Sequence, residues 1–331
     1  MRGLKYRKLG RNGPRVSAIS MGRGSQGIKL EDAPMVEAFN ATIRRAYELG
    51  INFFDSSDAY WGTRHEVLLG RAVKGFRDKV MVSSKFGNID LPDGKKATNG
   101  RPEYVQSSCE ASLKRMALDV IDVFYLHRVD PAVPIEETIG AMARLIEQGK
   151  VRWIGVCEAG LETLRRAHKA YPISALQTEY SLWFREVERD IIPVCRELGI
   201  GYVAYAPLGR GLLTGRIRTV DDLAPNDRRR QHPRFAPENL ARNVKLVEEL
   251  EAMARGQSVT AAQLALAWML AQGEDIVPIP GTNSMKNVEL NAAAADIRLS
   301  PEKVARLSEI FAIGAGAGKR YSERLLKGMG I

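Results

Sequence analysis

The stretch Ile121-Asp122-Val123-Phe124-Tyr125-Leu126-His127 has the composition of a buried β-strand that ends on a histidine. Its apolar residues are mainly β-branched or aromatic, the types that suit a pleated surface packed on both sides. The flanking ranges, Pro102 to Met116 and Ile135 to Gln148, carry apolar residues at helical spacing. A strand between two helices is the repeating unit of a parallel sheet, because parallel neighbours need a long crossover.

The same unit recurs along the chain. Further strands are expected at Val16 to Met21, Asn52 to Asp55, Val80 to Ser83, Trp153 to Val156, Ala175 to Gln177, Tyr202 to Tyr205 and Ile276 to Ile279. Further helices are expected from the Asp32 cap to Gly50, and at Leu161 to Ala170, Val187 to Leu198, Leu240 to Arg255 and Ala261 to Gln272. Eight strand–helix units favour a closed (β/α)8 barrel, the TIM barrel fold. An open doubly wound sheet is the alternative, because periodicity does not report closure.

No linker rich in Pro, Ser or Gly divides the 331 residues. The sequence therefore predicts one domain over 1–331, with a barrel core at about 15–315 and a tail at about 315–331. A composition of 45% hydrophobic and 27% charged residues excludes a disordered or collagen-like chain. No apolar run reaches the roughly 18 residues of a membrane helix, and Met1 to Leu4 begin no signal peptide. We expect a cytoplasmic protein without a membrane partner, in an oligomeric state that the sequence leaves open.

Positive charge exceeds negative charge, with 49 Lys+Arg against 39 Asp+Glu, but it clusters only in Arg228 to Arg234. One basic loop without a recognised module favours a nucleic-acid partner only weakly, since a small anionic cofactor attracts the same charge. Cys109, Cys157 and Cys195 lie far apart and have no Cys-x-x-Cys spacing, and the four histidines have no His-Glu-x-x-His spacing. Neither a disulfide framework nor a metal site is expected.

Polar residues stand at or just beyond the expected carboxyl ends of the strands, where barrel enzymes carry their sites. They are Asp55, Tyr60, Lys85, His127, Gln177 and Tyr205. A phenol with a pKa of about 10 releases its proton more readily beside an ammonium, and a carboxylate would hold that ammonium. A histidine could orient the same carbonyl. The first four residues therefore suit proton delivery to a carbonyl; a buried Asp/Lys pair with a packed tyrosine is the alternative.

Gly22 to Gly27 match the pattern G-x-G-x-x-G, but Ile28 to Ala33 separate them from the next helix. The dinucleotide fingerprint needs a helix that opens on the last glycine. These glycines are therefore expected to form a loop close to a bound ligand, without a Rossmann fold.

Several of these segments resemble the aldo-keto reductase superfamily. The similarity is carried by Gly50 to Tyr60, Ser84-Lys85, Asp122 to His127, Gln177 to Ser181, Tyr205 to Gly209 and Pro280 to Thr282. The resemblance implies a (β/α)8 barrel that transfers hydride from a nicotinamide cofactor to an aldehyde or ketone without a metal. It implies Tyr60 as general acid, Lys85 and Asp55 as the pair that tunes it, and His127 as the group that orients the carbonyl. A redox-sensing regulatory subunit with little turnover is the alternative within the same resemblance.

The resemblance also implies NADPH as the cofactor, with the Tyr205 ring stacked on the nicotinamide and Gln177 near its carboxamide. Neutral Asn283 and Asn287 stand where Arg or Lys often meets the 2′-phosphate, so NADH is expected to remain usable. Trp61, Phe86, Trp183 and Phe184 are candidate walls of the substrate pocket, with ordinary packing as the alternative. The cofactor residues expected from the resemblance are Gly22, Arg23, Asp55, Cys157, Gln177, Tyr205, Pro207, Leu208, Gly211, Gly215, Arg216, Gly281, Thr282, Asn283, Lys286 and Asn291.

Overall fold

The computed structural model describes residues 4–24 and 27–321. Seven strands form one sheet in the order β11-β10-β9-β8-β7-β4-β3, and each neighbouring pair is parallel. The strands are β3 (Phe53–Asp55), β4 (Met81–Phe86), β7 (Ile121–Leu126), β8 (Val151–Cys157), β9 (Ala175–Glu179), β10 (Gly201–Tyr205) and β11 (Ile276–Pro278). The α/β class and the parallel sheet are therefore confirmed.

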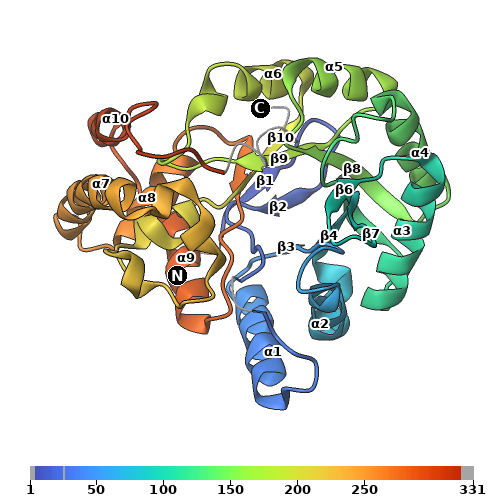
Figure 1. Ribbon diagram of the computed structural model, residues 1–331, viewed down its shortest axis with the longest axis horizontal. Coiled ribbons are helices and arrows are strands. Elements are labelled where there is room, and N and C mark those ends of the chain that lie inside the picture. Colours follow the sequence, from blue (N-terminus) through green and yellow to red (C-terminus); the bar gives the residue numbers. More distant parts are fainter. Residues whose placement is uncertain (1–3, 25–26, 322–331) are drawn as a thin grey trace.

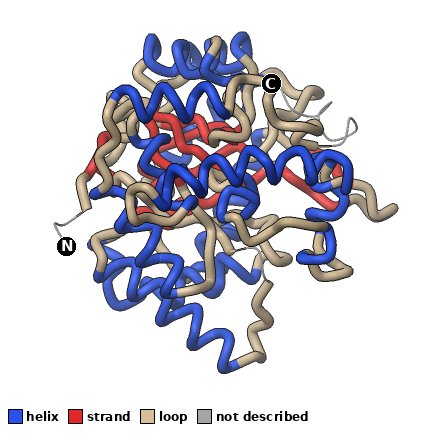
Figure 2. The backbone as a smooth tube through the Cα atoms, turned by 90° about the vertical axis from the view of Figure 1, so that its left-hand side faces the viewer, coloured by secondary structure: helices blue, strands red, loops and turns tan. Residues whose placement is uncertain are grey.

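The helices follow one another around the sheet in chain order, from α1 at the bottom of Figure 1 past α4 on the right to α7 and α8 on the left. Figure 2 shows the strands enclosed by this layer. The helices are α1 (Ala33–Glu48), α2 (Arg64–Val73), α3 (Pro102–Met116), α4 (Ile135–Glu147), α5 (Leu161–Ala170), α6 (Ile191–Leu198), α7 (Pro237–Arg255), α8 (Ala261–Leu270), α9 (Met285–Ala293) and α10 (Pro301–Ile310).

The expected strand from Val16 to Met21 is the clearest error of the sequence analysis. Within that range only β2 (Arg15–Ser17) is a strand, and it pairs antiparallel with β1 (Tyr6–Lys8), outside the seven-stranded sheet. The hydroxyl of Ser20 donates to the carbonyl of Ser17 at 3.1 Å. Serine side chains offer the backbone such local alternatives to a ladder, which explains the bend after Ser17.

Beyond this bend the chain bonds to both outer strands of the sheet. The amide of Ser20 donates to the carbonyl of Pro278 at 3.0 Å, and the amide of Met21 donates to that of Phe53 at 2.9 Å. Isolated parallel bridges pair Met21 with Phe54 and Gly22 with Gly281. A few residues, and no regular eighth strand, therefore connect β3 with β11.

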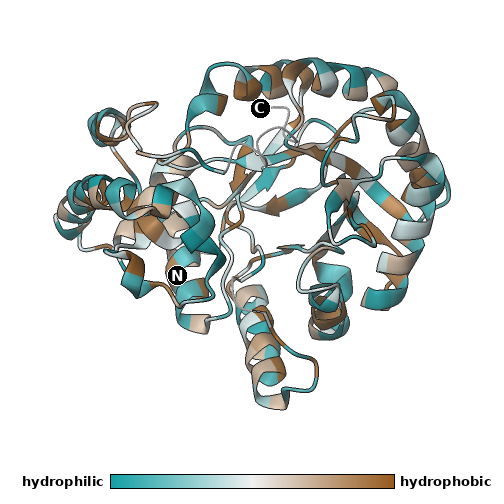
Figure 3. Cartoon of the chain, viewed as in Figure 1, coloured by the Kyte–Doolittle hydropathy of each residue, from teal (hydrophilic) through white to brown (hydrophobic). Residues whose placement is uncertain are grey.

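Alternation along the strands divides the buried residues into two layers. Phe53, Val123 and Tyr125 pack together in one core cluster, whereas their neighbours Phe54 and Phe124 belong to the larger cluster that includes the helices. In Figure 3 apolar colour marks the strands and parts of the helices. This alternation decides on which side of the sheet each functional side chain emerges.

Helix starts follow local capping signals. Asp32 caps α1 as expected, accepting from the amide of Met35 at 3.1 Å. α7 begins earlier than expected because Pro237 suits the first turn. α6 begins later, at Ile191, after the short helix Glu186–Glu188 and the cap Asp190. Four elements were not predicted from the sequence: α2, α9, α10 and the small hairpin of β5 (Asn88–Asp90) and β6 (Lys96–Thr98).

Among the described residues, none of the helices combines the length and apolar character required to cross a bilayer. Cys109, Cys157 and Cys195 are free thiols and are buried.

Candidate active site

Asp55 and Lys85 form a buried ion pair at the end of β3 and near the end of β4. The Nζ atom of Lys85 lies 2.5 Å from Oδ2 of Asp55, and neither side chain is more than 1% exposed. The same nitrogen donates to the carbonyl of Ser56 at 2.8 Å and to Oη of Tyr60 at 3.1 Å. An ammonium has three donors, so these three bonds use all of them. Because the Tyr60 oxygen accepts one of them, its own proton remains available to another acceptor.

The carboxylate of Asp55 is fixed by two further donors. The hydroxyl of Ser83 and the side-chain amide of Gln177 donate to Oδ1 at 2.8 and 2.9 Å. Gln177 was expected to hold the carboxamide of the cofactor. In this structure its amide nitrogen positions Asp55, and its role toward the carboxamide stays a prediction.

Burial and charge together set the protonation of this group. Burial raises the pKa of Tyr60, and this effect outweighs the opposing charge of Lys85. For Lys85, burial favours the neutral amine, but the charge of Asp55 and the contact with Tyr60 outweigh it and raise the pKa. At neutral pH Tyr60 is therefore a protonated phenol beside a charged ammonium.

His127 directly follows β7, and its amide donates to the carbonyl of Phe86 at 2.8 Å. Its ring meets the Tyr60 ring edge-on, with centroids 6.0 Å apart. Its Nδ1 atom lies 3.1 Å from the hydroxyl of Ser57. Burial, assisted by the charge of Lys85, holds the pKa of His127 well below its usual value. The imidazole is therefore neutral and carries one ring proton.

Arg23 and Trp61 also border Tyr60. The guanidinium of Arg23 lies over the Tyr60 ring, 4.7 Å from its centroid. Trp61 adopts a left-handed backbone with a φ of 55°, and its ring packs edge-on against His65 at 4.8 Å. The structure thus brings these two predicted residues to the tetrad of Asp55, Tyr60, Lys85 and His127.

The other candidate walls lie elsewhere. Phe86 alternates with Lys85 along β4, so it emerges on the opposite face, where its ring stacks on Phe124 at 4.9 Å. Trp183 is buried and packs edge-on against Phe311 at 5.7 Å. Phe184 is buried beneath the guanidinium of Arg320, 4.5 Å from its ring centroid.

Two predicted cofactor segments lie against each other. Gly22 pairs with Gly281 in a parallel bridge, and a Cβ atom on Gly281 would lie 1.9 Å from the carbonyl oxygen of Arg23. Only glycine allows this approach, because backbone atoms cannot give way as a flexible side chain does. The close approach joins the loop after β2 to the loop after β11.

The loop after β11 ends at the start of α9, and this region suits a phosphate. Ser284 caps the helix by accepting from the amide of Asn287, and the first turn has no acidic residue and an exposed Lys286. Such a helix start attracts anions through its free N–H groups and its dipole. The Thr282 hydroxyl accepts from the side chain of Asn287 at 3.3 Å, and Asn291 is buried on α9.

Backbone freedom marks the loop after β10. Pro207 and Leu208 lead into the short helix Gly209–Thr214, in which Arg210 and Gly211 have positive φ angles and depart from helical geometry. Gly215 ends that helix in the left-handed region, and Arg216 is exposed. The loop begins directly after Tyr205. The candidate nicotinamide residue Tyr205 is therefore followed closely by the cofactor candidates Gly211, Gly215 and Arg216.

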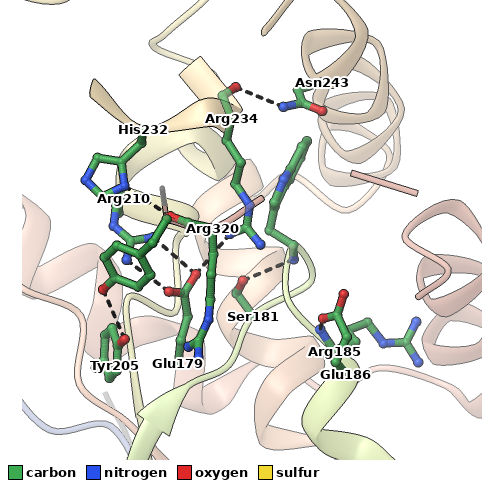
Figure 4. Close-up of polar contacts among 12 residues, drawn as sticks. Glu179, Ser181, Arg185, Glu186, Tyr205, Arg210, His232, Arg234, Asn243 and Arg320 are labelled. Atoms are coloured by element: carbon green, nitrogen blue, oxygen red, sulfur yellow. Dashed lines mark hydrogen bonds and ion pairs between the residues drawn. The ribbon is translucent and has the colours of Figure 1, made fainter. Parts of the chain in front are cut away.

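A second group of buried charges lies beside Tyr205 (Figure 4). We call it the arginine cluster; it consists of Glu158, Glu179, Arg210, Arg234 and Arg320. Glu179 accepts from Arg210 at 2.9 Å and from Arg234 at 2.9 Å. Glu158 accepts two bonds from Arg320, at 2.9 and 2.6 Å, and one from Oη of Tyr205 at 2.7 Å. The same Tyr205 oxygen lies 3.1 Å from Oη of Tyr321.

The cluster keeps Glu179 ionised, and it was not predicted from the sequence. Burial favours a neutral Glu179, but Arg210 and Arg234 outweigh it and lower its pKa to about 2. The paired residues lie 31, 55 and 162 positions apart, so spacing gives no signal. The sequence offered one indication: Glu158 and Glu179 each lie just beyond an expected buried strand. A buried carboxylate requires a partner, so each of them predicts a cation nearby.

The basic segment 228–234 is turned inward rather than solvated as a whole. Arg234 is buried against Glu179, Arg229 pairs with Asp227 at 2.7 Å, and Arg230 donates to the carbonyl of Leu223. These three arginines are therefore engaged by partners within the chain.

Across residues 4–24 and 27–321, no three His, Cys, Asp or Glu side chains are grouped in a way that could hold a metal ion. Cys157 is buried, and this burial raises the pKa of its thiol to about 12.

Comparisons with known proteins agree with this geometry. The model of the aldo/keto reductase family matches residues 18–312. A probable aldo-keto reductase 1 from Glycine max is 44% identical over 317 residues, covering 95% of this chain and 91% of that protein. A solved aldo-keto reductase from Klebsiella pneumoniae in complex with NADPH shares 28% identity and a TM-score of 0.73, with 96% and 99% of the two chains covered. A glycerol dehydrogenase from Gluconobacter oxydans shares the fold, with a TM-score of 0.83, 24% identity and coverage of 93% and 95%.

Proposed function

The chain belongs to the aldo/keto reductase family, and on this premise we propose that it reduces an aldehyde or ketone to an alcohol, with Tyr60 as the proton donor. The observation that carries the proposal is the bond from Lys85 to Oη of Tyr60. It leaves the phenolic proton directed to another acceptor and places a positive charge beside the oxygen that loses it. General acid catalysis requires both conditions.

Asp55 and His127 have supporting roles in this proposal. Asp55 holds the ammonium of Lys85, and Ser83 and Gln177 hold Asp55. His127 orients the carbonyl through its remaining ring nitrogen, because Nδ1 is occupied by Ser57. Trp61 borders the substrate, since it lies directly beside the acid.

We propose NADPH as the cofactor, which supplies the hydride when it is bound. The glycine approach at Gly22 and Gly281 and the helix start at Ser284 fit a nucleotide with a phosphate group. The NADPH complex of the Klebsiella pneumoniae relative supports the same cofactor. Residues proposed to hold it are Gly22, Arg23, Asp55, Cys157, Gln177, Tyr205, Pro207, Leu208, Gly211, Gly215, Arg216, Gly281, Thr282, Asn283, Lys286 and Asn291. We further propose that Ser20 to Gly22 take the place of an eighth barrel strand.

The test is the substitution Tyr60→Phe, which removes the proton and keeps the ring. Turnover with a panel of aldehydes and ketones, followed by NADPH absorbance, is expected to fall roughly 10²- to 10⁴-fold. The dissociation constant for NADPH should stay within about twofold, because the loss is confined to the reacting atoms. Near-normal turnover of this variant would refute the assigned acid. If the unsubstituted protein completes only a single turnover, it is a regulatory nicotinamide-binding protein.

A further inference from the structure

The hydroxyl of Ser57 contacts three groups. It accepts from the amide of Ala59 at 3.1 Å, lies 3.2 Å from Oδ1 of Asp58, and lies 3.1 Å from Nδ1 of His127. Ser57 itself is buried, so its hydroxyl depends on these three groups for its hydrogen bonds. A hydroxyl has one proton and two acceptor sites. The Ala59 amide uses one acceptor site, which leaves one proton and one acceptor site for Asp58 and His127.

The protonation of Asp58 decides whether the Ser57 hydroxyl donates to Asp58 and accepts from His127, or the reverse. An ionised Asp58 only accepts, so Ser57 donates to it and must then accept from a proton on Nδ1 of His127. A protonated Asp58 donates to Ser57, whose own proton then points to a bare Nδ1. A neutral imidazole carries one proton, so in the second state it is on Nε2. The change takes up one proton from solvent, and the ring proton moves from Nδ1 to Nε2.

We propose that Asp58 is a positioning residue that sets, through Ser57, which ring nitrogen of His127 carries the proton. Because Ser57 occupies Nδ1, only Nε2 can reach a substrate, and it donates a hydrogen bond to a carbonyl only while Asp58 is protonated. The effect on carbonyl reduction rests on the function proposed above, whereas the change of tautomer does not depend on that function.

The charges around Asp58 suit a change near neutral pH. Asp58 faces Glu66 of α2, Arg115 and Tyr104 of α3, the carbonyl of Lys85 on β4, and the Ser57–His127 pair. Arg115 is paired with Glu66 at 2.5 Å, so it does little to keep Asp58 ionised. Burial, followed by the charge of Glu66, raises the pKa of Asp58 to about 7.

His127 does not take up a second proton over this range. The cations Lys85, Arg128 and Arg23 face it, and burial with these charges keeps its pKa well below the usual value. The ring therefore stays neutral, and only the location of its single proton changes.

Two other histidines provide built-in references for the measurement. Nδ1 of His168 accepts from the amide of Ile173 at 3.2 Å, so that ring carries its proton on Nε2. Nδ1 of His232 faces the carbonyl of Arg320 at 3.1 Å, so that ring carries its proton on Nδ1.

The experiment uses the full chain with ¹⁵N-labelled histidine and follows the ring nitrogens by two-bond proton–nitrogen correlation from pH 5.5 to 8.5. His127 is expected to match His168 below a pH of about 7 and His232 above it. In Asp58→Asn, which cannot ionise, His127 should keep a single tautomer throughout. The exposed Asp78→Asn is the matched control and should leave the change intact.

A second measurement connects the tautomer to catalysis. The KM for the carbonyl in the unsubstituted protein is expected to rise about 10-fold from pH 6 to pH 8, with an unchanged NADPH dissociation constant. Asp58→Asn should abolish this rise, and Ser57→Ala should uncouple the tautomer of His127 from pH.

A single His127 tautomer across the pH range in the unsubstituted protein would overturn the inference, and that measurement requires no variant. So would the same change in Asp58→Asn. These results leave the role of Tyr60 untouched, whereas normal turnover of Tyr60→Phe would refute the proposed acid and leave the tautomer result standing.

Discussion

The Asp55–Lys85 pair and the arginine cluster are both buried ion pairs beside the carboxyl ends of strands, and they differ in what remains after pairing. Lys85 spends its third donor on the Tyr60 oxygen, which leaves a phenolic proton without an assigned acceptor. In the cluster, both oxygens of Glu158 and of Glu179 accept from arginine. The first group retains a proton to transfer, whereas every carboxylate oxygen of the second is paired with an arginine.

The two groups also differ in which parts of the chain they join. Asp55 and Lys85 lie on neighbouring strands, β3 and β4. The cluster joins the ends of β8 and β9 to the loop of Arg210, the segment of Arg234 and the C-terminal segment of Arg320. Figure 4 shows the part around Glu179 with Arg210, Arg234 and Arg320. A buried pair adds little net stability over apolar packing, but loss of one partner is costly. Substitutions at Asp55 and Lys85 should therefore lower turnover, whereas substitutions in the arginine cluster should mainly lower stability by loosening the segments that the cluster joins.

The largest effect is expected for Lys85→Met, which should lower both turnover and the free energy of unfolding. Turnover should fall at least about 100-fold, because Tyr60 loses the adjacent cation. The free energy of unfolding should fall by about 3–5 kcal/mol, because Asp55 is left buried and charged. Urea unfolding and NADPH-linked assays measure the two quantities.

The double variant Asp55→Asn/Lys85→Met sharpens this result. It should recover much of the stability and none of the turnover, because the unpaired charge is gone and the cation is still missing. Equal loss of stability in both variants would show that packing, rather than charge, is responsible.

Glu179→Gln is expected to separate the two groups. It leaves Arg210 and Arg234 without a carboxylate, so the free energy of unfolding should fall by about 3 kcal/mol. Turnover per folded molecule should change less than about tenfold, because the Glu179 carboxylate bonds to Arg210 and Arg234 and not to a residue of the tetrad. The exposed Glu197→Gln, which breaks a surface pair with Arg165, is the matched control. If turnover fell sharply without a loss of stability, the arginine cluster would not act mainly by holding chain segments together.

Acid should weaken the arginine cluster in a defined window. The folded pKa of Glu179 is about 2, below the ordinary value of 4.5, so its contribution is present above about pH 4.5 and is lost as the pH falls toward 2. By pH 3 the lost part should be about 2 kcal/mol. The measurement is the free energy of unfolding from pH 6 to pH 3, and the slope should be shallower in Glu179→Gln. Parallel slopes would exclude Glu179 as their source.

The smallest effect is expected for Arg320→Met, which releases one attachment only. The amide of Ala317 donates to the side chain of Asn243 at 2.7 Å, three residues before Arg320. Exchange of that amide should accelerate about tenfold. The free energy of unfolding should fall by less than the roughly 3 kcal/mol expected for Glu179→Gln, because the Tyr205 hydroxyl and the Glu179 amide still donate to Glu158. Arg306→Met, which removes an exposed pair with Glu309, is the control and should leave Ala317 unchanged. Unaltered exchange would mean that Asn243 alone holds the segment.

The sequence predicted what depends on neighbouring residues. β-Branched and aromatic runs located the seven strands of the parallel sheet, and Asp32 with Pro34 located the start of α1. Parallel strands end at the same edge, so alternation also predicted that Asp55, Lys85 and His127 would meet. Phe86 was the exception, because its register puts it opposite Lys85.

What the sequence did not predict depends on distant contacts. The bend after Ser17 needs Ser20, and the bonds of Ser20 to Gly22 need strands far along the chain. α2 begins after Thr63, which has a positive φ and no side-chain cap, so no start signal was present. The arginine cluster arises only when the C-terminal segment reaches Glu158.

The contacts of Ser20 and Met21 with both β11 and β3 affect how the chain is synthesised. Residues 276–278 leave the ribosome late, and until then β10 is an outer strand without its final neighbour and Ser20 lacks its acceptor at Pro278. Unpaired strand edges can recruit other chains, and contacts between distant segments form slowly. A nascent chain paused before residue 276 is therefore the form most exposed to misassembly, and chaperone demand should decline sharply once β11 has emerged.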